Sequence, residues 1–375
     1  MGGFIRDWLI PRVVFLPYWI NRFLLFLVGA ARNLTKGRSG TDTSGVLCIE
    51  AGAKGWEIIE YQELYASACE YLGPDQVHRV IIDKDKDYLV QLKQVLDKLS
   101  PTHYLYSPRT GSQNRVVGLY QSFRISVMLH WRDITPIASL TDLPVRTWRA
   151  QCAVVTAGSG IVVSLMSPKE THPIFPHQRI IGPCLMPFSE TTMNRLNALS
   201  VDRHQGEKPT AVFTGSLYEP RTSVLQKISD GLKERGLLLE MKGRSLENKR
   251  SPDSEYWQTL INASLVVTTA DQIAEGGRDW TWLPHFIYRY TEVLICGRLL
   301  VAPDIPGIRR YYTPGVHFLA FSSPDQAVEV IANHLNNETE LEKIAAQGKA
   351  KAQALVTSHA FWNCLDMALG RRSMT

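Results

Sequence analysis

The feature that most constrains the fold is an alternation of short apolar runs with longer amphipathic stretches, which begins near residue 46 and starts again near residue 210. The apolar runs predict strands over residues 46–49, 77–82, 103–106, 125–130, 153–155, 210–213, 237–241, 264–269 and 299–302. The amphipathic stretches predict helices over residues 61–72, 88–99, 221–235, 256–262, 289–295, 327–336, 340–356 and 360–369. Strands that alternate with helices of this length favour parallel sheets covered by helices on both faces. We therefore expect an α/β chain with two tandem Rossmann-like, doubly wound domains.

Two polar stretches suggest where the domains end. Residues 36–45 are small and polar, as in a linker. Residues 200–209 form a second polar stretch, which separates the first alternation of strands and helices from the second. The predicted domains are therefore an arm over residues 1–40 and two α/β domains over residues 44–205 and 206–375. Ligands of such sheets bind beyond the carboxyl ends of the strands, so we expect a site in a cleft between the two domains.

The charge of the chain is concentrated in the arm. The sequence has 41 basic and 36 acidic residues, a formal net charge of +5, and residues 1–40 hold six of the basic residues and one of the acidic ones. The rest of the chain is therefore neutral, which is not the pattern of a nucleic-acid-binding protein. A hydrophobic content of 45% also excludes a disordered chain and a polytopic membrane protein.

The arm interleaves arginines with large apolar and aromatic residues. Its longest apolar run covers residues 23–31, and a membrane span needs roughly 20 residues. We expect the arm to lie in the membrane interface at the cytoplasmic face, with Trp8, Tyr18 and Trp19 at headgroup depth and the arginines on anionic lipid. A tilted span in which Arg22 snorkels and an extension packed on protein are the alternatives.

Six cysteines are scattered along the chain without a C-x-x-C pair, at Cys48, Cys69, Cys152, Cys184, Cys296 and Cys364. A zinc ribbon is therefore not expected. Their apolar neighbours indicate buried free thiols in a reducing compartment.

A glycine turn follows the first predicted strand of the second domain. Gly215 and Ser216 lie between that strand and the next helix, and Arg221 falls in the first turn of the helix. Backbone N–H groups at such a turn can approach an anion, and a guanidinium there can hold a diphosphate with two hydrogen bonds. The alternative is a tight turn followed by a solvated arginine.

Glu292 lies in the predicted helix over residues 289–295 and is a candidate for binding a ribose. A carboxylate accepts two hydrogen bonds, as vicinal hydroxyls require. The alternative is a surface glutamate that stabilises the helix N-terminus through the helix dipole.

Residues 210–370 resemble the C-terminal domain of GT-B glycosyltransferases, especially the bacterial spore-maturation-type group. The resemblance rests on the Gly215 turn with Arg221, on the segment from Tyr290 through Glu292 and Gly297 to Val301, and on four shorter matches. These are Asp304 to Gly307, Tyr311, Gly315 to Phe318, and Ser322 to Asp325. The resemblance implies that domain 206–375 binds a nucleotide-sugar and domain 44–205 faces the acceptor.

The resemblance also implies individual roles in donor binding. Glu292 would hold the ribose, Arg221 would contact the diphosphate, and His285 and Arg289 would be nearby polar groups. Retaining members often carry a second glutamate eight positions before the ribose glutamate, and this chain has Pro284 there. The nucleotide-sugar would be a co-substrate, and no tightly bound cofactor or metal is expected.

Three further motifs each have two interpretations. His130 and Asp133, after the predicted strand over 125–130, are a candidate general base with its carboxylate or a capping pair in a loop. Asp83, Asp85 and Asp87 could hold a metal with a diphosphate, or form a solvated loop and a helix N-cap. The tryptophans of residues 276–282 could stack on a base or sugar, or pack between domains.

The expected function is transfer of a sugar, as in a hexosyltransferase, to a glycan or lipid-linked acceptor near the membrane. Such an enzyme would serve surface polysaccharide or glycolipid synthesis. A non-catalytic nucleotide-sugar-binding or scaffold subunit is the main alternative. A dinucleotide-dependent oxidoreductase is disfavoured, because no G-x-G-x-x-G follows the first strand.

Overall fold

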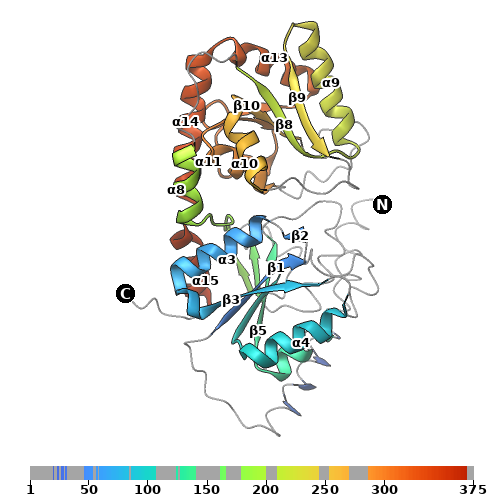
Figure 1. Cartoon of the computed structure of the whole chain (residues 1–375), viewed down its shortest axis with the longest axis vertical. Coiled ribbons are helices and arrows are strands. Elements are labelled where there is room, and N and C mark those ends of the chain that lie inside the picture. Colours follow the sequence, from blue (N-terminus) through green and yellow to red (C-terminus); the bar gives the residue numbers. More distant parts are fainter. Residues whose placement is uncertain are drawn as a thin grey trace, which may run out of the picture. The chain divides into compact units, whose positions relative to one another are not determined.

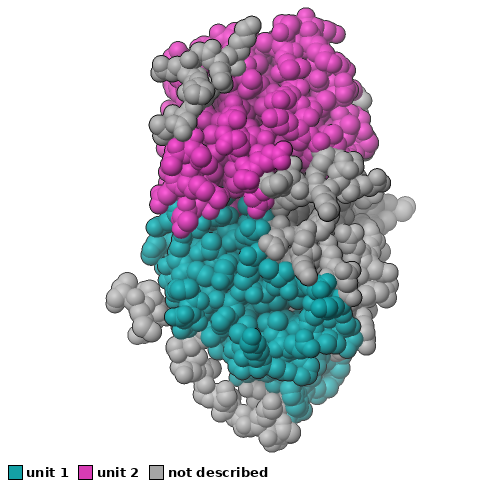
Figure 2. Space-filling model, viewed as in Figure 1, with its two compact units in different colours: residues 1–190, 357–375 teal, residues 191–356 magenta. Residues whose placement is uncertain are grey.

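A computed structural model of the chain contains two compact units (Figure 2). Unit 1 consists of residues 1–190 and 357–375, and unit 2 consists of residues 191–356. The structure describes residues 20, 23–24, 27–28, 30–31, 46–53, 56–57, 59–83, 86–106, 124–125, 127–140, 161–165, 179–199, 209–244, 253–269 and 286–369.

In the described residues, the sheet of unit 1 is built on six parallel strands. In chain order they are β1 (Leu47–Ala53), β3 (Val77–Ile82), β4 (His103–Tyr106), β5 (Thr135–Leu140), β6 (Ile161–Ser164) and β7 (Arg179–Ile181). β1 lies between β3 and β4, and the short β2 (Trp56–Glu57) pairs with its end in the antiparallel direction. Helices with defined bounds in its described residues include α3 (Ile59–Leu72), the 3-10 turn η2 (Pro74–Gln76), α4 (Tyr88–Leu99) and α15 (Ser358–Leu369) (Figure 1).

Local sequence explains where α4 begins and ends. The Asp87 side chain accepts a hydrogen bond from the Val90 N–H at 2.9 Å, and the helix ends at Ser100, whose φ of 45° is left-handed. Leu89, Leu92 and Leu96 are buried at helical spacing. Asp87 therefore acts as a helix N-cap, which is the capping interpretation of the aspartate run. Asp85 lies outside the described residues, and within them no group of three His, Cys, Asp or Glu side chains could hold a metal.

The described part of unit 2 forms a sheet of five parallel strands in the order β12-β11-β10-β8-β9. They are β8 (Ala211–Ser216), β9 (Leu239–Arg244), β10 (Leu265–Val267), β11 (Leu299–Pro303) and β12 (Leu319–Phe321). The helices are α9 (Arg221–Glu234), α10 (Asp253–Asn262), α11 (Tyr288–Ile295), α12 (Pro306–Arg309), α13 (Pro324–Leu335) and α14 (Glu338–Leu355). A further helix, α8 (Glu190–Leu199), begins at the boundary between the units.

The strand order of unit 2 reverses beside β8. The chain passes from β8 to its neighbour β9 and then crosses to β10 on the other side of β8. In open parallel sheets, the carboxyl ends of the two strands at such a switch point flank the usual ligand crevice. The strand order therefore makes the residues at the carboxyl ends of β8 and β10 candidates for ligand binding.

One predicted strand is wrong, and five of the described strands were missed. The described residues of 124–131 are helical, and the neighbouring strand is β5. Ile125 and Leu129 are four positions apart, as on one helix face, and a short apolar run does not distinguish the two structures. β5 carries Pro136, which argues against a strand in sequence-based prediction. β2, β6, β7 and β12 were also missed, and the predicted strand over residues 153–155 lies outside the described residues.

The last helix belongs to unit 1, whereas the predicted domain 206–375 included it. The Trp362 indole N–H donates to the Ser67 hydroxyl of α3 at 3.0 Å, and the Tyr71 hydroxyl of α3 donates to the Asn363 side-chain oxygen at 2.5 Å. Trp362 is only 1% exposed. The chain thus leaves unit 1 at residues 190–191 and returns at residues 356–357, instead of dividing near residue 205.

The arm is described at seven positions, all helical, between residues 20 and 31. Ile20, Phe23 and Leu27 are 54%, 63% and 45% exposed, and their spacing places them on one side of a helix. None of the helices described in the structure has the length and apolar character needed to cross a membrane.

Candidate functional site

The carboxyl end of β8 requires a glycine. Gly215 has a φ of +144°, and a β-carbon placed there would lie 3.0 Å from Arg289 Nη1. That guanidinium donates a hydrogen bond to the carbonyl of Thr214, the preceding residue. The glycine turn expected from the sequence is present. Because Gly215 has no β-carbon, the Arg289 side chain can reach the end of the strand.

Arg221 joins the two strands at the switch point. Its Nε donates to the Thr269 hydroxyl, just after β10, at 3.0 Å, and its Nη1 donates to the Ser216 carbonyl at the end of β8 at 3.1 Å. Its guanidinium carbon also lies 4.5 Å from the centre of the Tyr218 ring. Arg221 is therefore partly buried and held in place at the first turn of α9, so the interpretation as a solvated arginine is wrong.

Glu292 is buried at the same edge of the sheet. Its Oε2 accepts a hydrogen bond from the Tyr256 hydroxyl at 2.6 Å and lies 3.3 Å from Arg289 Nε. Arg289 also lies over the Tyr256 ring, 5.0 Å from its centre. Because Glu292 is only 5% exposed, the alternative of a surface glutamate is wrong.

The electrostatics of this group follow from its burial. Burial raises the pKa of Tyr256 well above its ordinary value, with the nearby Glu292 charge adding to the rise and Arg289 opposing it. Tyr256 therefore remains a protonated donor to the carboxylate near neutral pH. Arg221, Arg289 and Glu292 together carry one excess positive charge, which favours an anionic ligand.

Sequence reasoning found part of this group and missed the rest. Gly215, Ser216, Arg221, Arg289 and Glu292 lie at the carboxyl edge of the sheet in unit 2. Tyr256, Tyr218 and Thr269 were missed, and of these only Thr269 had a sequence signal, its place after an apolar run. His285, Pro284 and the loop over residues 276–282 lie outside the described residues.

His130 and Asp133 lie elsewhere. His130 is helical, Asp133 has a left-handed φ of 64°, and the Asp133 N–H donates to the His130 carbonyl at 3.2 Å. This turn precedes β5, so both residues lie at the amino ends of the parallel strands in unit 1. The predicted position at a strand's carboxyl end is wrong, because the strand assumed there is a helix.

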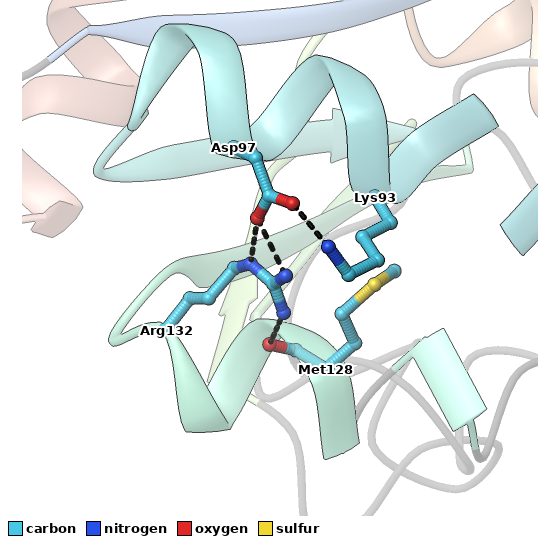
Figure 3. Close-up of polar contacts among 4 residues, drawn as sticks. All are labelled: Lys93, Asp97, Met128 and Arg132. Atoms are coloured by element: carbon cyan, nitrogen blue, oxygen red, sulfur yellow. Dashed lines mark hydrogen bonds and ion pairs between the residues drawn. The ribbon is translucent and has the colours of Figure 1, made fainter. Parts of the chain in front are cut away.

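Ionic contacts tie the same turn to α4 (Figure 3). Arg132 Nη2 donates to the Asp97 carboxylate at 2.6 Å, and Arg132 Nε donates to the same oxygen at 3.1 Å. Arg132 Nη1 reaches the Met128 carbonyl at 3.5 Å, and Lys93 pairs with the other oxygen of Asp97. These contacts give the turn a structural role between α4 and β5.

Unit 1 has a buried carboxylate at its own switch point, between β1 and β4. Glu50 Oε2 accepts hydrogen bonds from the Tyr88 hydroxyl at 2.6 Å and the Tyr104 hydroxyl at 2.5 Å. Burial and the Glu50 charge raise the pKa values of both phenols well above their ordinary range. Glu50 is fully buried within the sheet.

Comparison with known proteins gives a family match and several similar folds. Residues 244–363 match the glycosyl transferase-like family, and no curated protein matches the chain. The structure of Anabaena HepE in complex with UDP and glucose aligns with a TM-score of 0.56 at 14% identity, over 87% of this chain and all of that one.

Two other solved structures show how widely the fold is used. Sucrose-phosphate synthase from Thermosynechococcus elongatus aligns with a TM-score of 0.52 at 12% identity, over 88% of this chain and 98% of that one. A putative UDP-N-acetylglucosamine 2-epimerase from Listeria monocytogenes aligns with a TM-score of 0.52 at 10% identity, over the same shares. At these identities the likeness concerns the fold alone. The chain resembles the GT-B glycosyltransferases: it has their α/β fold with two parallel sheets, and its residues 244–363 match the glycosyl transferase-like family.

Proposed function

We propose that this protein transfers a sugar from a nucleotide-sugar, and that unit 2 binds the nucleotide. The observation that carries the proposal is the position of Arg221. It bridges Ser216 at the end of β8 and Thr269 after β10, at the switch point of a parallel sheet and in the first turn of α9. A guanidinium and a helix N-terminus at one place suit a diphosphate.

The neighbouring groups supply the rest of a nucleotide site. Glu292 offers a carboxylate to vicinal ribose hydroxyls, and Tyr256 and Arg289 hold it in place. During transfer the nucleoside diphosphate leaves with increased negative charge. Arg221 and the N-terminus of α9 would stabilise that charge without having to reorganise.

The comparisons support this class of ligand. HepE was solved in complex with UDP and glucose and also with UDP-glucose. The similar fold of an epimerase means that fold alone does not distinguish transfer from other nucleotide-sugar chemistry. The family match over residues 244–363 favours transfer.

We further propose an acceptor at the cytoplasmic face of a membrane, either a glycan or a lipid-linked sugar. The arm supports this proposal in two ways. Residues 1–40 carry all of the net charge, and Ile20, Phe23 and Leu27 present large apolar side chains to the solvent. Basic and apolar residues together are what an interfacial segment needs.

Calorimetry of the full chain with UDP, uridine and UDP-glucose tests the nucleotide site. Arg221→Lys should weaken UDP binding about 10- to 100-fold and leave uridine binding unchanged, because a point charge cannot replace the guanidinium fork. Arg235→Lys is the matched control at the other end of α9, where Arg235 pairs with Glu329 on the surface. An equal loss for UDP and uridine would contradict the diphosphate role.

Turnover tests transfer itself. Labelled UDP-sugars incubated with the protein and a membrane extract should place the label in the lipid or glycan fraction, and Arg221→Lys should reduce that label. Binding without turnover across several nucleotide-sugars would instead indicate a binding or scaffold subunit.

A further inference from the structure

Two thiols lie next to each other in unit 1, one in each of the two chain segments that form this unit. Cys184 follows β7, and its Sγ donates to Cys364 Sγ of α15 at 3.4 Å, although the residues are 180 positions apart. Cys184 is buried, and Cys364 is partly exposed. Cys48 and Cys296 are fully buried.

Both partners of this contact are fixed by their surroundings. The Cys184 N–H donates to the Ser164 carbonyl at the end of β6 at 2.9 Å. On α15, the two residues that precede Cys364 in sequence, Trp362 and Asn363, form hydrogen bonds with α3. The thiol contact is therefore held from both sides.

The two cysteines also flank the passages of the chain between the units. Cys184 lies shortly before the exit at residues 190–191, and Cys364 lies shortly after the return at residues 356–357. Glu70 of α3 accepts hydrogen bonds from the Glu190 N–H at 2.8 Å and the Ser358 hydroxyl at 3.2 Å, so it binds both passages. A covalent bond between the cysteines would close a loop that contains the whole of unit 2.

We propose that Cys184 and Cys364 form a reversible disulfide when the protein meets a peroxide. A bond length of about 2.04 Å requires the sulfurs to approach by about 1.4 Å, which side-chain rotation can supply. The thiols expected from the sequence to stay free would thus include one redox pair.

The chemistry starts at Cys364. The hydrogen bond from Cys184 lowers the pKa of Cys364 to about 7, against a smaller opposing effect of burial. The thiolate attacks one peroxide oxygen, the O–O bond breaks, and the hydroxide that leaves takes a proton to become water. Cys364 becomes a sulfenic acid.

Cys184 completes the reaction. Its sulfur attacks the Cys364 sulfur, the S–O bond breaks, and the departing hydroxide takes the proton that Cys184 gives up. Two thiols and one hydrogen peroxide give one disulfide and two water molecules, and a dithiol reductant reverses the reaction.

The test uses the full-length protein, treated with graded hydrogen peroxide, quenched with an alkylating agent and mapped by peptide mass spectrometry. We expect a linked peptide that joins Cys184 to Cys364, a loss of two free thiols, and recovery of both with dithiothreitol. Amide hydrogen exchange in α15 should be slower in the oxidised protein than in the reduced one.

Three variants locate the bond. Cys184→Ser and Cys364→Ser should each prevent the linked peptide, whereas Cys69→Ser, at a partly buried cysteine of α3, should leave it unchanged. The wild-type map decides even if a variant fails to fold. A map in which Cys364 remains a sulfenic or sulfinic acid, or bonds to a different cysteine, would overturn the proposal.

Discussion

Glu292 holds a charge that is almost fully removed from water, which is costly unless other groups bind it. The Tyr256 hydroxyl donates to the carboxylate, and the Arg289 guanidinium lies beside it. Arg289 in turn donates to the Thr214 carbonyl at the end of β8. These contacts offset the cost of burying the charge and also hold the carboxylate in one position, as a ligand-binding group requires.

Glu292→Gln tests the ribose assignment. The amide keeps the size of the side chain but replaces an acceptor oxygen with a donor, so UDP binding should weaken by about 1.5–3 kcal/mol. Calorimetry measures the loss. Tyr256→Phe is the control, because it removes the phenol but leaves the carboxylate for the ligand, and its effect on binding should be smaller. Unchanged affinity in a folded Glu292→Gln protein would exclude the ribose role.

Gly215→Ala tests the turn at the end of β8. The φ of +144° is strained for any other residue, and the new β-carbon would press on Arg289, so the free energy of unfolding should fall by about 1–3 kcal/mol. UDP affinity should fall as well. Gly236→Ala is the control, because φ is +71° there and nothing lies within 4 Å of the added carbon. Urea unfolding of this variant should show a lower free energy of unfolding, and calorimetry should show an unchanged UDP affinity. Equal UDP affinity in both variants would contradict the prediction.

At the scale of elements, α15 shows that a helix can belong to a unit from which it is distant in sequence. Trp362 fills the space against α3, and its N–H binds Ser67. A buried Trp contributes both a large apolar area and the hydrogen bond of its ring N–H. The association of α15 with unit 1 therefore depends strongly on one side chain.

Trp362→Ala should lower the free energy of unfolding of unit 1 by about 3–5 kcal/mol, because it leaves a large cavity. Hydrogen exchange should quicken in α3 and hardly change in α9. Trp257→Ala is the matched control, since Trp257 is buried in α10 of unit 2 and the exchange pattern should be the opposite. Faster exchange in α9 than in α3 after Trp362→Ala would place α15 with unit 2.

At the scale of the whole molecule, the net charge and the two sheets lie in different parts of the sequence. The net charge of +5 resides in residues 1–40, and the strands of both sheets lie in the chain from Leu47 onward. A folded core does not require a charged extension of this kind. We therefore expect the arm to govern location and the units to govern ligand binding.

A chain that starts at Thr41 tests this division. It should be soluble without detergent, keep the thermal transition of the full chain and bind UDP with equal affinity. Only the full chain should sediment with anionic vesicles, and more so than with neutral ones, because each basic residue near an anionic surface contributes roughly 1 kcal/mol. Unfolding or aggregation of the shorter chain, with a full chain that is soluble without lipid, would show that the arm is structural.

The sequence by itself determined the α/β class and most elements of unit 2. Helices α9, α11, α13 and α14 were predicted within a few residues, because their apolar positions repeat at helical spacing. The turn at Gly215 was also identified from local sequence, and its glycine has a positive φ. Local steric and hydrophobic patterns are written in neighbouring residues, so a single sequence can show them.

Only the tertiary structure decided which distant residues meet. It assigned α15 to unit 1, made residues 127–131 a helix rather than a strand, and buried Glu292 beside Tyr256. Each outcome depends on packing between elements far apart in the chain, and such packing leaves no periodic signal in either element. The strand order, which brings Arg221 to Thr269 across β8 and β10, is likewise a property of the assembled sheet.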